Sequence, residues 1–385
     1  LEALKRVLLT NKEEIARAIS ADFGSRSRTE SLVAEVFVTI AGIDYAKERL
    51  HEWMDVEPRE VAWTFLPGRA EVHNQPLGVV GIIAPWNYPV QLVFAPLVAA
   101  LAAGNRAMVK PSELVPETSA LIAKMIASAF APDHVTCHEG GVEVSEAFSR
   151  LAFDHLIFTG STRVGKAVMK AAAENLVPVT LELGGKSPAI VGRDFSIATA
   201  AYRIMSGKLF NAGQTCIAPD YALVPRKEVD AFVAECKAIV ARMYPTLIGN
   251  ADYTAVVNAR QKARLEGYLS EAAEKGAKVV RLNPANESFE GSKKLEPTLA
   301  EVFVNRGALY IHLHRYQDAL DEINRGIAMN PSEPEKAYYN RGLAYEMLDN
   351  PKAAYLDYRK ASQLNPKWPD PVKAMGRFQV KAAGS

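Results

Sequence analysis

The sequence has few cysteines, almost no excess of charge and no long apolar run. Its 385 residues include only three cysteines, Cys137, Cys216 and Cys236. Three cysteines spread over about 100 residues exclude a disulfide framework and offer no zinc-ligand spacing, so we expect a cytoplasmic protein without a structural metal. The formal net charge of +1 gives no electrostatic reason to expect binding to nucleic acid or an anionic membrane. No apolar run reaches the roughly 20 residues of a membrane span, and no signal segment follows Leu1.

Residues 1–56 carry apolar side chains at helical spacing. Asn11 with Glu14 three residues later is typical of a capping pair, so we expect the first helix to begin near Asn11. Gly24 is the expected end of that helix. A second helix is predicted by an apolar stripe of Leu32, Val36, Ile40, Ile43, Ala46 and Leu50.

From about residue 76 onward, short apolar runs alternate with helical stretches. The expected strands are Val79–Ala84, Arg106–Val109, His134–Cys137, Asp154–Phe158 and Val179–Leu183. The expected helices are Leu92–Ala103, Thr118–Phe130 and Arg163–Ala173. Continuous Val, Ile and Leu strands separated by helices are typical of a parallel sheet with both faces covered. We therefore predict an α/β fold with an open parallel-sheet dinucleotide-binding domain at residues 1–183.

Residues 184–299 continue with mixed α/β signals, which we interpret as a second, partial α/β domain. Its clearest elements are an expected helix over Ser196–Leu209 and an expected strand over Tyr221–Val224.

From Ala300 onward the sequence repeats itself with an offset of 35 residues. Phe303, Gly307, Tyr310, Ala319 and Pro331 recur as Tyr338, Gly342, Tyr345, Ala354 and Pro366. Small residues in this pattern let two helices approach closely, and the proline ends the second helix. Residues 300–385 therefore resemble two tetratricopeptide repeats, an all-α segment closed by a helix over Asp370–Val380. No flexible linker separates Leu299 from Ala300, which makes a fusion of two unrelated sequences one hypothesis.

Polar and glycine-containing segments follow the predicted strands, at the edge where open α/β sheets bind ligands. The segments are Pro85–Pro89, Lys110–Glu113, Phe158–Gly165, Leu181–Lys186 and Phe210–Pro219. Gly160 and Gly165 flank Ser161 at the start of a predicted helix, where main-chain N–H groups can bind an anion such as pyrophosphate. A turn of this kind is more often a simple helix cap, and its spacing is not that of a Rossmann glycine motif.

The loop after the second expected strand carries Lys110, Ser112 and Glu113. A carboxylate in this position can accept hydrogen bonds from the two hydroxyls of a ribose. For the loop considered alone, a solvated surface loop is the more ordinary interpretation.

Cys216 and Glu182 lie in surroundings that suggest chemistry. Cys216 is in a glycine-containing turn with polar neighbours, whereas Cys137 and Cys236 fall inside a predicted strand and helix, where packing is the usual role. Glu182 lies near the end of an apolar strand. We expect a carboxylate at that depth to be paired or to have a raised pKa, which suits a general base.

Together and in this order, these segments resemble the aldehyde dehydrogenase superfamily over residues 1–299. Gly213–Asp220 and Ala21–Gly24 are most similar to its class-3 and coniferyl-aldehyde branch. The resemblance implies NAD(P)-dependent oxidation of an aldehyde to a carboxylic acid, with residues 184–299 as part of the catalytic domain. Both coniferyl-type aromatic aldehydes and aliphatic aldehydes stay open as substrates.

The resemblance also assigns catalytic roles. Cys216 matches the nucleophile that forms a thiohemiacetal and then a thioester. Glu182 matches the residue that activates the hydrolytic water. The side-chain amide of Asn87 and the main-chain N–H of Cys216 match the oxyanion hole.

Cofactor-binding roles follow from the same resemblance. The expected residues are Trp86, Lys110, Ser112, Glu113, Gly160, Ser161 and Gly165. Lys110 and Glu113 match residues on the adenosine ribose, and Trp86 and Ser161 match residues near the pyrophosphate. Because Glu113 favours an unphosphorylated ribose, NAD is the expected cofactor, with NADP as the alternative.

Residues 300–385 lack a Glu-Ile-Phe-Gly-Pro motif that the resemblance leads us to expect in a large C-terminal piece. In the family this piece holds the nicotinamide ribose, completes the catalytic sheet and supplies the subunit-pairing segment. We therefore expect residues 184–299 to expose apolar strand surface. Two alternatives to a working dehydrogenase stay open: an impaired remnant in a scaffold whose repeats bind a protein or peptide, and a cofactor-independent esterase that uses Cys216.

Overall fold

The computed structural model of the chain describes residues 1–301, 311, 314–328, 331 and 333–378. The chain divides into two compact units, of which the first contains Leu1–Ala259 and Asn283–Leu295. The second contains Arg260–Leu282 and the chain from Glu296 onward. Among the described residues, no helix has both the length and the apolar character that crossing a bilayer requires.

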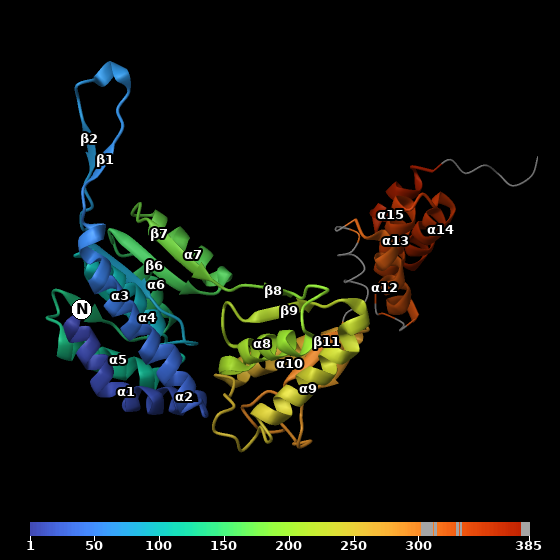
Figure 1. Cartoon of the computed structure of the whole chain (residues 1–385), viewed down its shortest axis with the longest axis horizontal. Helices are drawn as coiled ribbons and strands as arrows, with labels where there is room; N and C mark the ends of the chain where they lie inside the picture. The colour runs from blue at the N-terminus through green and yellow to red at the C-terminus, as the bar shows by residue number, and fades with distance from the viewer. Residues whose placement is uncertain (302–310, 312–313, 329–330, 332, 379–385) are drawn as a thin grey trace, which may run out of the picture. The chain divides into compact units, whose positions relative to one another are not determined.

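The first unit holds most of the regular structure (Figure 1). Its helices are α1 (Glu2–Phe23), α2 (Arg28–Ser31), α3 (Val38–Trp53), α4 (Gln91–Ala102), α5 (Pro116–Ala129), α6 (Val142–Ser149), α7 (Thr162–Ala173), α8 (Ile197–Leu209) and α9 (Val229–Met243), with a π-helical turn η1 (Leu32–Phe37) and the 3-10 turns η2 (Trp63–Phe65), η3 (Phe210–Gly213) and η4 (Arg226–Glu228). Its strands are β1 (Glu57–Arg59), β2 (Ala70–Val72), β3 (Val79–Ile83), β4 (Arg106–Lys110), β5 (Val135–Cys137), β6 (His155–Gly160), β7 (Val179–Leu183), β8 (Ser187–Ile190) and β9 (Pro219–Leu223).

Five parallel strands form the main sheet in the order β5-β4-β3-β6-β7. The chain builds outward from β3 through β4 to β5, and then adds β6 and β7 on the other side of β3. The direction of winding therefore reverses between β3 and β6, which creates the crevice where open α/β sheets bind ligands. The predicted open parallel sheet is confirmed, and its strands begin and end within two residues of the predicted positions.

Helices cover both faces of this sheet, as the continuous apolar strands predict. Val80 and Ile82 of β3 pack in one core cluster with residues of α1, α4 and α5. Ile83 packs in a second cluster with residues of α6 and α7. Gly81 faces the second cluster too, because a Cβ at this position would lie 2.6 Å from the ring of Phe153.

The first helix differs from its prediction. Helix α1 runs without interruption through Asn11, whose side-chain amide donates to the carbonyl of Val7 at 2.7 Å. The predicted helix start at Asn11 is wrong, because Leu4 and Leu8 are fully buried on the same apolar stripe and extend the helix toward the N-terminus. The predicted end is confirmed, since Gly24 follows the helix with a φ of 84° in the left-handed region.

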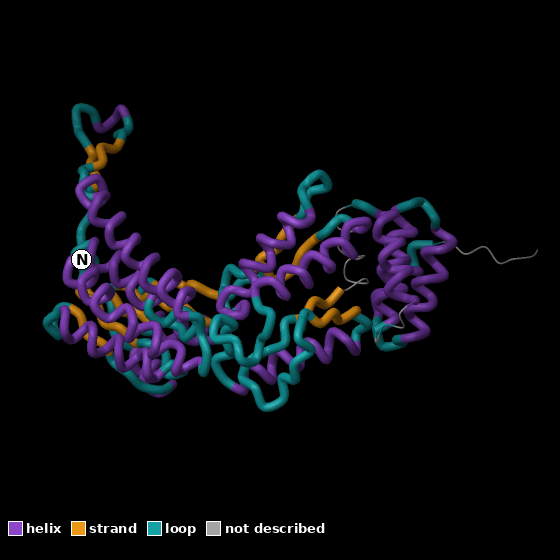
Figure 2. The backbone as a smooth tube through the Cα atoms, turned by 60° about the horizontal axis from the view of Figure 1, so that its bottom comes forward, coloured by secondary structure: helices purple, strands orange, loops and turns teal. Residues whose placement is uncertain are grey.

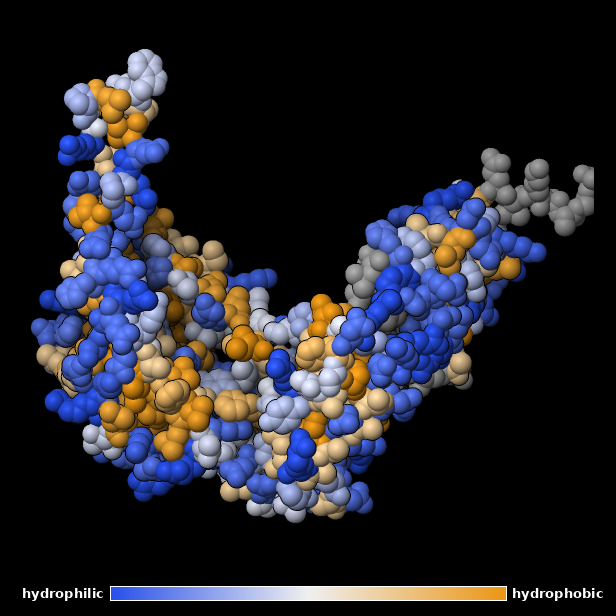
Figure 3. Space-filling view, in the orientation of Figure 1, coloured by the Kyte–Doolittle hydropathy of each residue, from blue (hydrophilic) through white to orange (hydrophobic). Residues whose placement is uncertain are grey.

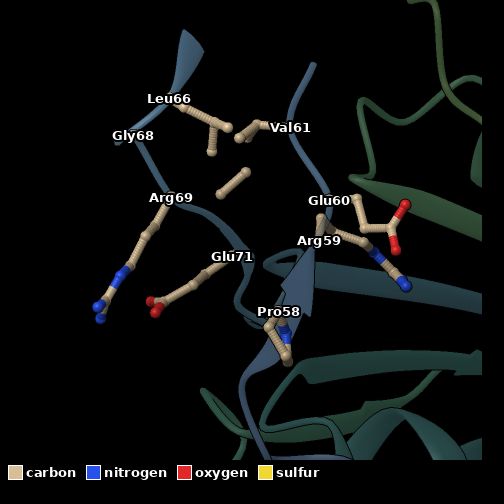
Figure 4. A pocket seen from close by; sticks show the side chains of 9 residues that line it. Pro58, Arg59, Glu60, Val61, Leu66, Gly68, Arg69 and Glu71 are labelled. Atoms are coloured by element: carbon tan, nitrogen blue, oxygen red, sulfur yellow. The ribbon is translucent and has the colours of Figure 1, made fainter. Parts of the chain in front are cut away.

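Strands β1 and β2 form a two-stranded antiparallel hairpin that projects from the first unit. Its tip exposes Trp63, Phe65 and Leu66, and Figure 3 shows apolar side chains gathered there. A cavity of about 560 Å³ opens along the hairpin and is lined by residues of both strands and of the segment that connects them, including Arg59 and Glu71 (Figure 4). None of the candidate site residues lines this cavity.

The segment after the main sheet contains β8 and β9, which pair in parallel, and the helices α8 and α9, which pack on each other. Ile190 and Ile217 expose about three quarters of their surface, at 76% and 77%. Ile190 belongs to β8, whereas Ile217 lies in the loop before β9, so the predicted exposure of apolar strand surface is confirmed at Ile190.

The second unit begins with α10 (Ala259–Glu274) and the antiparallel pair β10 (Lys278–Arg281) and β11 (Thr298–Glu301). The helices α12 (Tyr316–Ala328), α13 (Pro334–Met347), α14 (Pro351–Leu364) and α15 (Pro369–Met375) follow. Figure 2 shows α12, α13 and α14 packed side by side, as helical repeats predict. Gly342 allows α13 to approach α14, since a Cβ there would lie 2.7 Å from the ring of Tyr358. The repeat positions Phe303, Gly307 and Tyr310 lie outside the described residues.

Candidate active site

Two loops that are far apart in the sequence are joined by hydrogen bonds. The first loop follows β3 and carries Asn87, and the second follows η3 and carries Cys216. The side-chain amide of Asn87 donates to the carbonyl of Gln214 at 3.1 Å. The hydroxyls of Tyr88 and Thr215 lie 2.6 Å apart, within hydrogen-bond distance. Asn87 and Cys216, which the resemblance assigns to one catalytic site, therefore lie on loops in direct contact.

The chain before Cys216 adopts an unusual backbone conformation. Asn211, Ala212 and Gly213 have φ values of 52°, 51° and 76°, so three successive residues lie in the left-handed region. The buried side-chain amide of Asn211 donates to the carbonyl of Asn87 at 3.0 Å and to that of Gln214 at 3.2 Å. This left-handed turn is therefore tied to the Asn87 loop and to the cysteine loop at once.

Gln214 fixes the other side of the cysteine loop. Its side-chain nitrogen donates to the carbonyl of Ala255 at 3.0 Å, and its side-chain oxygen accepts from the main-chain N–H of Val257 at 3.1 Å. An amide that both donates and accepts in this way holds its loop in one orientation.

The three cysteines differ in accessibility. Cys216 is exposed, Cys137 is half-buried in β5 and Cys236 is fully buried in α9. Burial raises the pKa of both the Cys137 and Cys236 thiols to about 12. Since the thiolate is the nucleophile, these two cysteines are chemically quiet near neutral pH, in agreement with their predicted packing roles.

Glu182 lies in β7 and is exposed, so the predicted depth of this carboxylate is wrong. The reason is topological, because β7 is an edge strand of the main sheet and its side chains alternate between half-buried and exposed. Glu182 pairs in register with Thr159, next to Gly160 at the carboxyl end of β6.

Gly185, two residues after the end of β7, lies against the cysteine loop. A Cβ at Gly185 would lie 2.7 Å from the carbonyl oxygen of Cys216, so the two main chains are in close contact. Only glycine fits such an approach without displacing one of the loops. The segment that carries Glu182 thus reaches the cysteine loop within three residues.

The expected cofactor-binding residues gather at the carboxyl ends of β3, β4 and β6. Trp86 follows β3, Lys110 ends β4, and Ser161 follows β6, beside the point where the strand order reverses. Ser161 caps α7, accepting from the N–H of Val164 at 3.3 Å. Gly165 lets this helix approach β7, since a Cβ would lie 2.9 Å from a methyl group of Leu183. A helix N-terminus at this crevice fits the pyrophosphate of a dinucleotide.

Of the three expected cofactor-binding residues at the end of β4 and in the loop after it, only Glu113 is presented to solvent. Lys110 is 1% exposed, and its ammonium group donates to the carbonyl of Pro111 at 2.7 Å and lies 3.4 Å from the Glu113 carboxylate. Ser112 is buried and accepts from the N–H of Leu114 at 3.3 Å. Lys110 and Ser112 hold the loop in shape, while the 40% exposed Glu113 carboxylate can accept hydrogen bonds from a ligand.

Three charged residues near the N-terminus, which no sequence motif indicated, support these loops. Arg26 and Glu35 form a fully buried ion pair at 3.0 Å. Arg26 also donates to the carbonyl of Asn87 at 3.0 Å, and Glu35 accepts from the N–H groups that begin α4. Glu30 accepts from the main-chain N–H of Asn211 at 2.9 Å. Burial raises the pKa of Glu30 and of Glu35. The only sequence signal for these three residues was Glu35, a carboxylate next to Val36 of the predicted apolar stripe.

Comparison with known proteins identifies relatives of most of the chain. The sequence model of the aldehyde dehydrogenase family matches residues 1–308, and that of the tetratricopeptide repeat matches residues 335–367. The coniferyl aldehyde dehydrogenase of a Pseudomonas species is 51% identical over 295 residues, which are 76% of this chain and 61% of the relative. The 4,4'-diaponeurosporen-aldehyde dehydrogenase of Staphylococcus aureus is 37% identical over 310 residues, which are 80% of this chain and 66% of the relative.

Solved structures give the same result. The substrate-bound Staphylococcus aureus AldH aligns with a TM-score of 0.71 and 37% identity, over 78% of this chain and 64% of that structure. The aldehyde dehydrogenase of Mycobacterium tuberculosis complexed with NAD+ aligns with a TM-score of 0.68 and 28% identity, over 78% and 62%. The chain spans about three fifths of the length of its first curated relatives, at 61%. The predicted resemblance is confirmed, and the chain belongs to the aldehyde dehydrogenase family.

Proposed function

We propose that the chain oxidises an aldehyde to a carboxylic acid with NAD(P), and that Cys216 is the nucleophile. The observation that supports the proposal is the hydrogen bond from Asn87 to Gln214, which joins the loop of an amide donor to the loop of an exposed cysteine. The same observation favours a working site over a silent remnant in a scaffold. Membership of the family supports the reaction class.

In the first step the Cys216 thiolate adds to the carbonyl carbon of the aldehyde, and the carbon–oxygen double bond becomes a single bond. Negative charge develops on the former carbonyl oxygen. The second N–H of the Asn87 amide and the main-chain N–H of Cys216 donate to this oxygen. An amide suits the role because it donates without titrating, and its link to Gln214 fixes its position before the substrate binds.

In the last step Glu182 takes a proton from a water molecule that attacks the thioester carbon. The carbon–sulfur bond breaks, the carboxylic acid leaves, and Cys216 is restored as a thiolate. The exposed position of Glu182 at the edge of the sheet gives it access to solvent, with which it exchanges the proton.

Between these two steps the carbon bound to Cys216 releases a hydride and re-forms its double bond to oxygen, which leaves the thioester. When bound, NAD would supply the acceptor for this hydride. We propose that the N-terminus of α7, with Ser161, Gly160 and Gly165, holds the pyrophosphate beside Trp86. Glu113 would accept hydrogen bonds from the adenosine ribose, while Lys110 and Ser112 shape its loop. A carboxylate at this point repels a 2′-phosphate, so NAD is preferred to NADP.

The names of the relatives guide the choice of substrate. Of three relatives that are 51–52% identical to this chain, one is named coniferyl aldehyde dehydrogenase and two are named probable coniferyl aldehyde dehydrogenase. We therefore propose an aromatic aldehyde of the coniferyl type as the first substrate, with aliphatic aldehydes as the alternative.

The repeats suggest a second role for the C-terminal helices. The match to a tetratricopeptide repeat at residues 335–367 supports binding of a protein or peptide partner by this segment.

The proposal is tested by mixing the purified chain with NAD and coniferyl aldehyde and following the absorbance of the reduced cofactor. We expect reduction by the unchanged chain and none by Cys216→Ala. Reduction that survives in Cys216→Ala contradicts the proposed nucleophile. Hydrolysis of an activated ester by Cys216 without any cofactor reduction would instead support the esterase alternative.

A further inference from the structure

The left-handed turn before Cys216 needs an external support. Asn211 and Ala212 both have positive φ values, 52° and 51°, although each carries a Cβ that makes this conformation unfavourable. Strained backbone of this kind persists only where neighbouring groups hold it in place. The turn Asn211–Gly213 lies three to five residues before the proposed nucleophile, so whatever holds it also sets the position of the cysteine loop.

Glu30 supplies the contact to the main chain of this turn. Its carboxylate accepts from the N–H of Asn211 at 2.9 Å, across 181 positions of the sequence. The same oxygen lies 3.4 Å from the hydroxyl of the buried Thr254, which donates to it. Glu30 itself is fixed in the first turn of α2, where its main-chain N–H donates to the cap residue Ser27 at 3.4 Å.

The turn Asn211–Gly213 also contacts both loops of the candidate site. Asn211 is fully buried, and its side-chain amide donates to the carbonyls of Asn87 and Gln214. A displacement of the Asn211 main chain would therefore move the proposed oxyanion donor and the cysteine loop relative to each other.

We propose that Glu30 is a positioning residue that holds the turn Asn211–Gly213 and through it aligns Cys216 with Asn87. The inference rests on the proposed function, because it gives Glu30 a part in the same site. Glu30 acts through Asn211 and does not itself contact the reacting atoms.

The chemistry of the contact predicts which substitutions are tolerated. Glu30→Ala removes the acceptor and leaves the N–H of Asn211 without its partner. Glu30→Gln keeps an acceptor oxygen at the same reach and loses only the charge. Ala212→Gly removes the Cβ from one left-handed residue and so lowers the cost of the turn without removing a hydrogen bond.

The test measures aldehyde oxidation, hydrogen–deuterium exchange of the peptide around residues 208–216, and the rate at which iodoacetamide alkylates Cys216. We expect Glu30→Ala to lower kcat by about 10- to 100-fold, the ratio that corresponds to losing a hydrogen bond to a charged group. KM for the aldehyde and Kd for NAD should change less than about threefold, because the cofactor crevice is built from other residues. Exchange in the peptide should become faster, and Glu30→Gln should recover kcat to within about threefold.

Two further variants separate positioning from general instability. Glu13→Ala removes an exposed carboxylate that pairs with Arg28 on the same N-terminal helices, and it should leave all three measurements unchanged. Ala212→Gly combined with Glu30→Ala should recover part of the lost kcat. If Glu30→Ala melts below the assay temperature, Glu30→Asp, which shortens the reach by one carbon, takes its place.

The inference is overturned if Glu30→Ala keeps kcat within twofold and the exchange of the peptide does not change. It is also overturned if Glu30→Gln is impaired as severely as Glu30→Ala. If the unchanged chain oxidises no aldehyde, the proposed function fails, and the positioning role is then judged from hydrogen–deuterium exchange and alkylation alone. A change in both rates with Glu30→Ala supports the positioning role. No change in either rate contradicts it.

Discussion

The side-chain amide of Asn87 donates to the main-chain carbonyl of Gln214 at 3.1 Å, across 127 positions of the sequence. An amide nitrogen carries two hydrogens, so one can anchor the cysteine loop while the other donates to a substrate oxygen. The side chain proposed to stabilise the oxyanion therefore also fixes the distance between its own loop and that of the nucleophile.

Replacing Asn87 should affect turnover more than binding. Asn87→Ala removes the proposed oxyanion donor, and we expect kcat for aldehyde oxidation to fall by about 100- to 1,000-fold. Steady-state kinetics with NAD and coniferyl aldehyde provide the measurement. Asn175→Ala, which removes an exposed side-chain amide that donates to Arg150, is the matched control and should retain full activity. A fall of less than threefold for Asn87→Ala contradicts the assigned role.

Two adjacent glycines should respond differently to the same substitution. In Gly185→Ala the new Cβ would lie 2.7 Å from the carbonyl oxygen of Cys216, so one of the two main chains must shift. We expect aldehyde oxidation to fall at least tenfold, since misplacement of a reacting group by about 1 Å costs on the order of 100-fold. Gly184→Ala meets no atom within 4 Å and should remain active. Equal activities of the two variants would show that the contact with Cys216 is unimportant.

The three thiols should differ in their rate of alkylation. With a pKa of about 12, Cys137 and Cys236 are thiolates in only about one molecule in ten thousand at pH 8. We expect iodoacetamide at pH 8 to label the exposed Cys216 first, as shown by the masses of the peptides. Raising the pH by one unit should increase the small thiolate fraction of the other two about tenfold. Faster labelling of Cys137 than of Cys216 at pH 8 contradicts the burial assigned to it.

Breaking the buried ion pair under the Asn87 loop should destabilise the chain. Arg26→Met leaves the Glu35 carboxylate buried without its partner, and we expect the free energy of unfolding to fall by about 3–5 kcal/mol. Denaturant titration provides the measurement. Arg28→Met, which breaks the exposed pair with Glu13, is the control and should unfold at the same midpoint as the unchanged chain.

The pH dependence of the Arg26→Met variant gives a second readout. Burial raises the pKa of Glu35 above its value in the unfolded chain, so the folded state binds the proton more tightly. A raised pKa contributes stability that is present below the unfolded pKa and is lost as the pH rises through the folded pKa. Arg26→Met should therefore be more stable at about pH 5 than at pH 8, and adding Glu35→Gln should remove this difference. A loss of stability in Arg26→Met that is the same at both pH values would contradict the role given to the Glu35 carboxylate.

The helical repeats should be sensitive to Gly342. In Gly342→Ala the new Cβ would lie 2.7 Å from the ring of Tyr358, and we expect this overpacking to cost about 1–3 kcal/mol. Thermal unfolding followed by circular dichroism measures the effect. Gly267→Ala in α10 meets nothing within 4 Å and should be neutral or slightly stabilising, because alanine favours a helix more than glycine does. An unchanged melting temperature for Gly342→Ala is the contradicting result.

The sequence predicted the main sheet because its signals are local. Each strand contains a short apolar run, and a helix follows four of the five strands, so the strands of the sheet could be placed to within two residues. The cysteine turn and the Asn87 loop were predicted as parts of one site through their motifs. Helix α1 was misplaced because the cap preference of Asn11 is weaker than the burial of Leu4 and Leu8.

The remaining features depend on contacts that no local pattern reports. Glu182 was expected to be deep because its strand is apolar, but the position of β7 at the edge of the sheet decides its exposure. Arg26 donates to the carbonyl of Asn87, 61 positions further along the sequence, and Glu30 accepts from the N–H of Asn211, 181 positions further along. Neither residue belongs to a recognisable motif, so only the folded chain shows what they hold.

The most direct test of the account is to trap the covalent intermediate. The chain is mixed with NAD and coniferyl aldehyde, quenched in acid within one turnover, digested and analysed by mass spectrometry, with Glu182→Gln to slow hydrolysis. The account predicts that the acyl group is attached to the peptide containing Cys216, and that it accumulates further in Glu182→Gln. Oxidation of the aldehyde with no acyl group on Cys216, or with the group on Cys137 or Cys236, would contradict it.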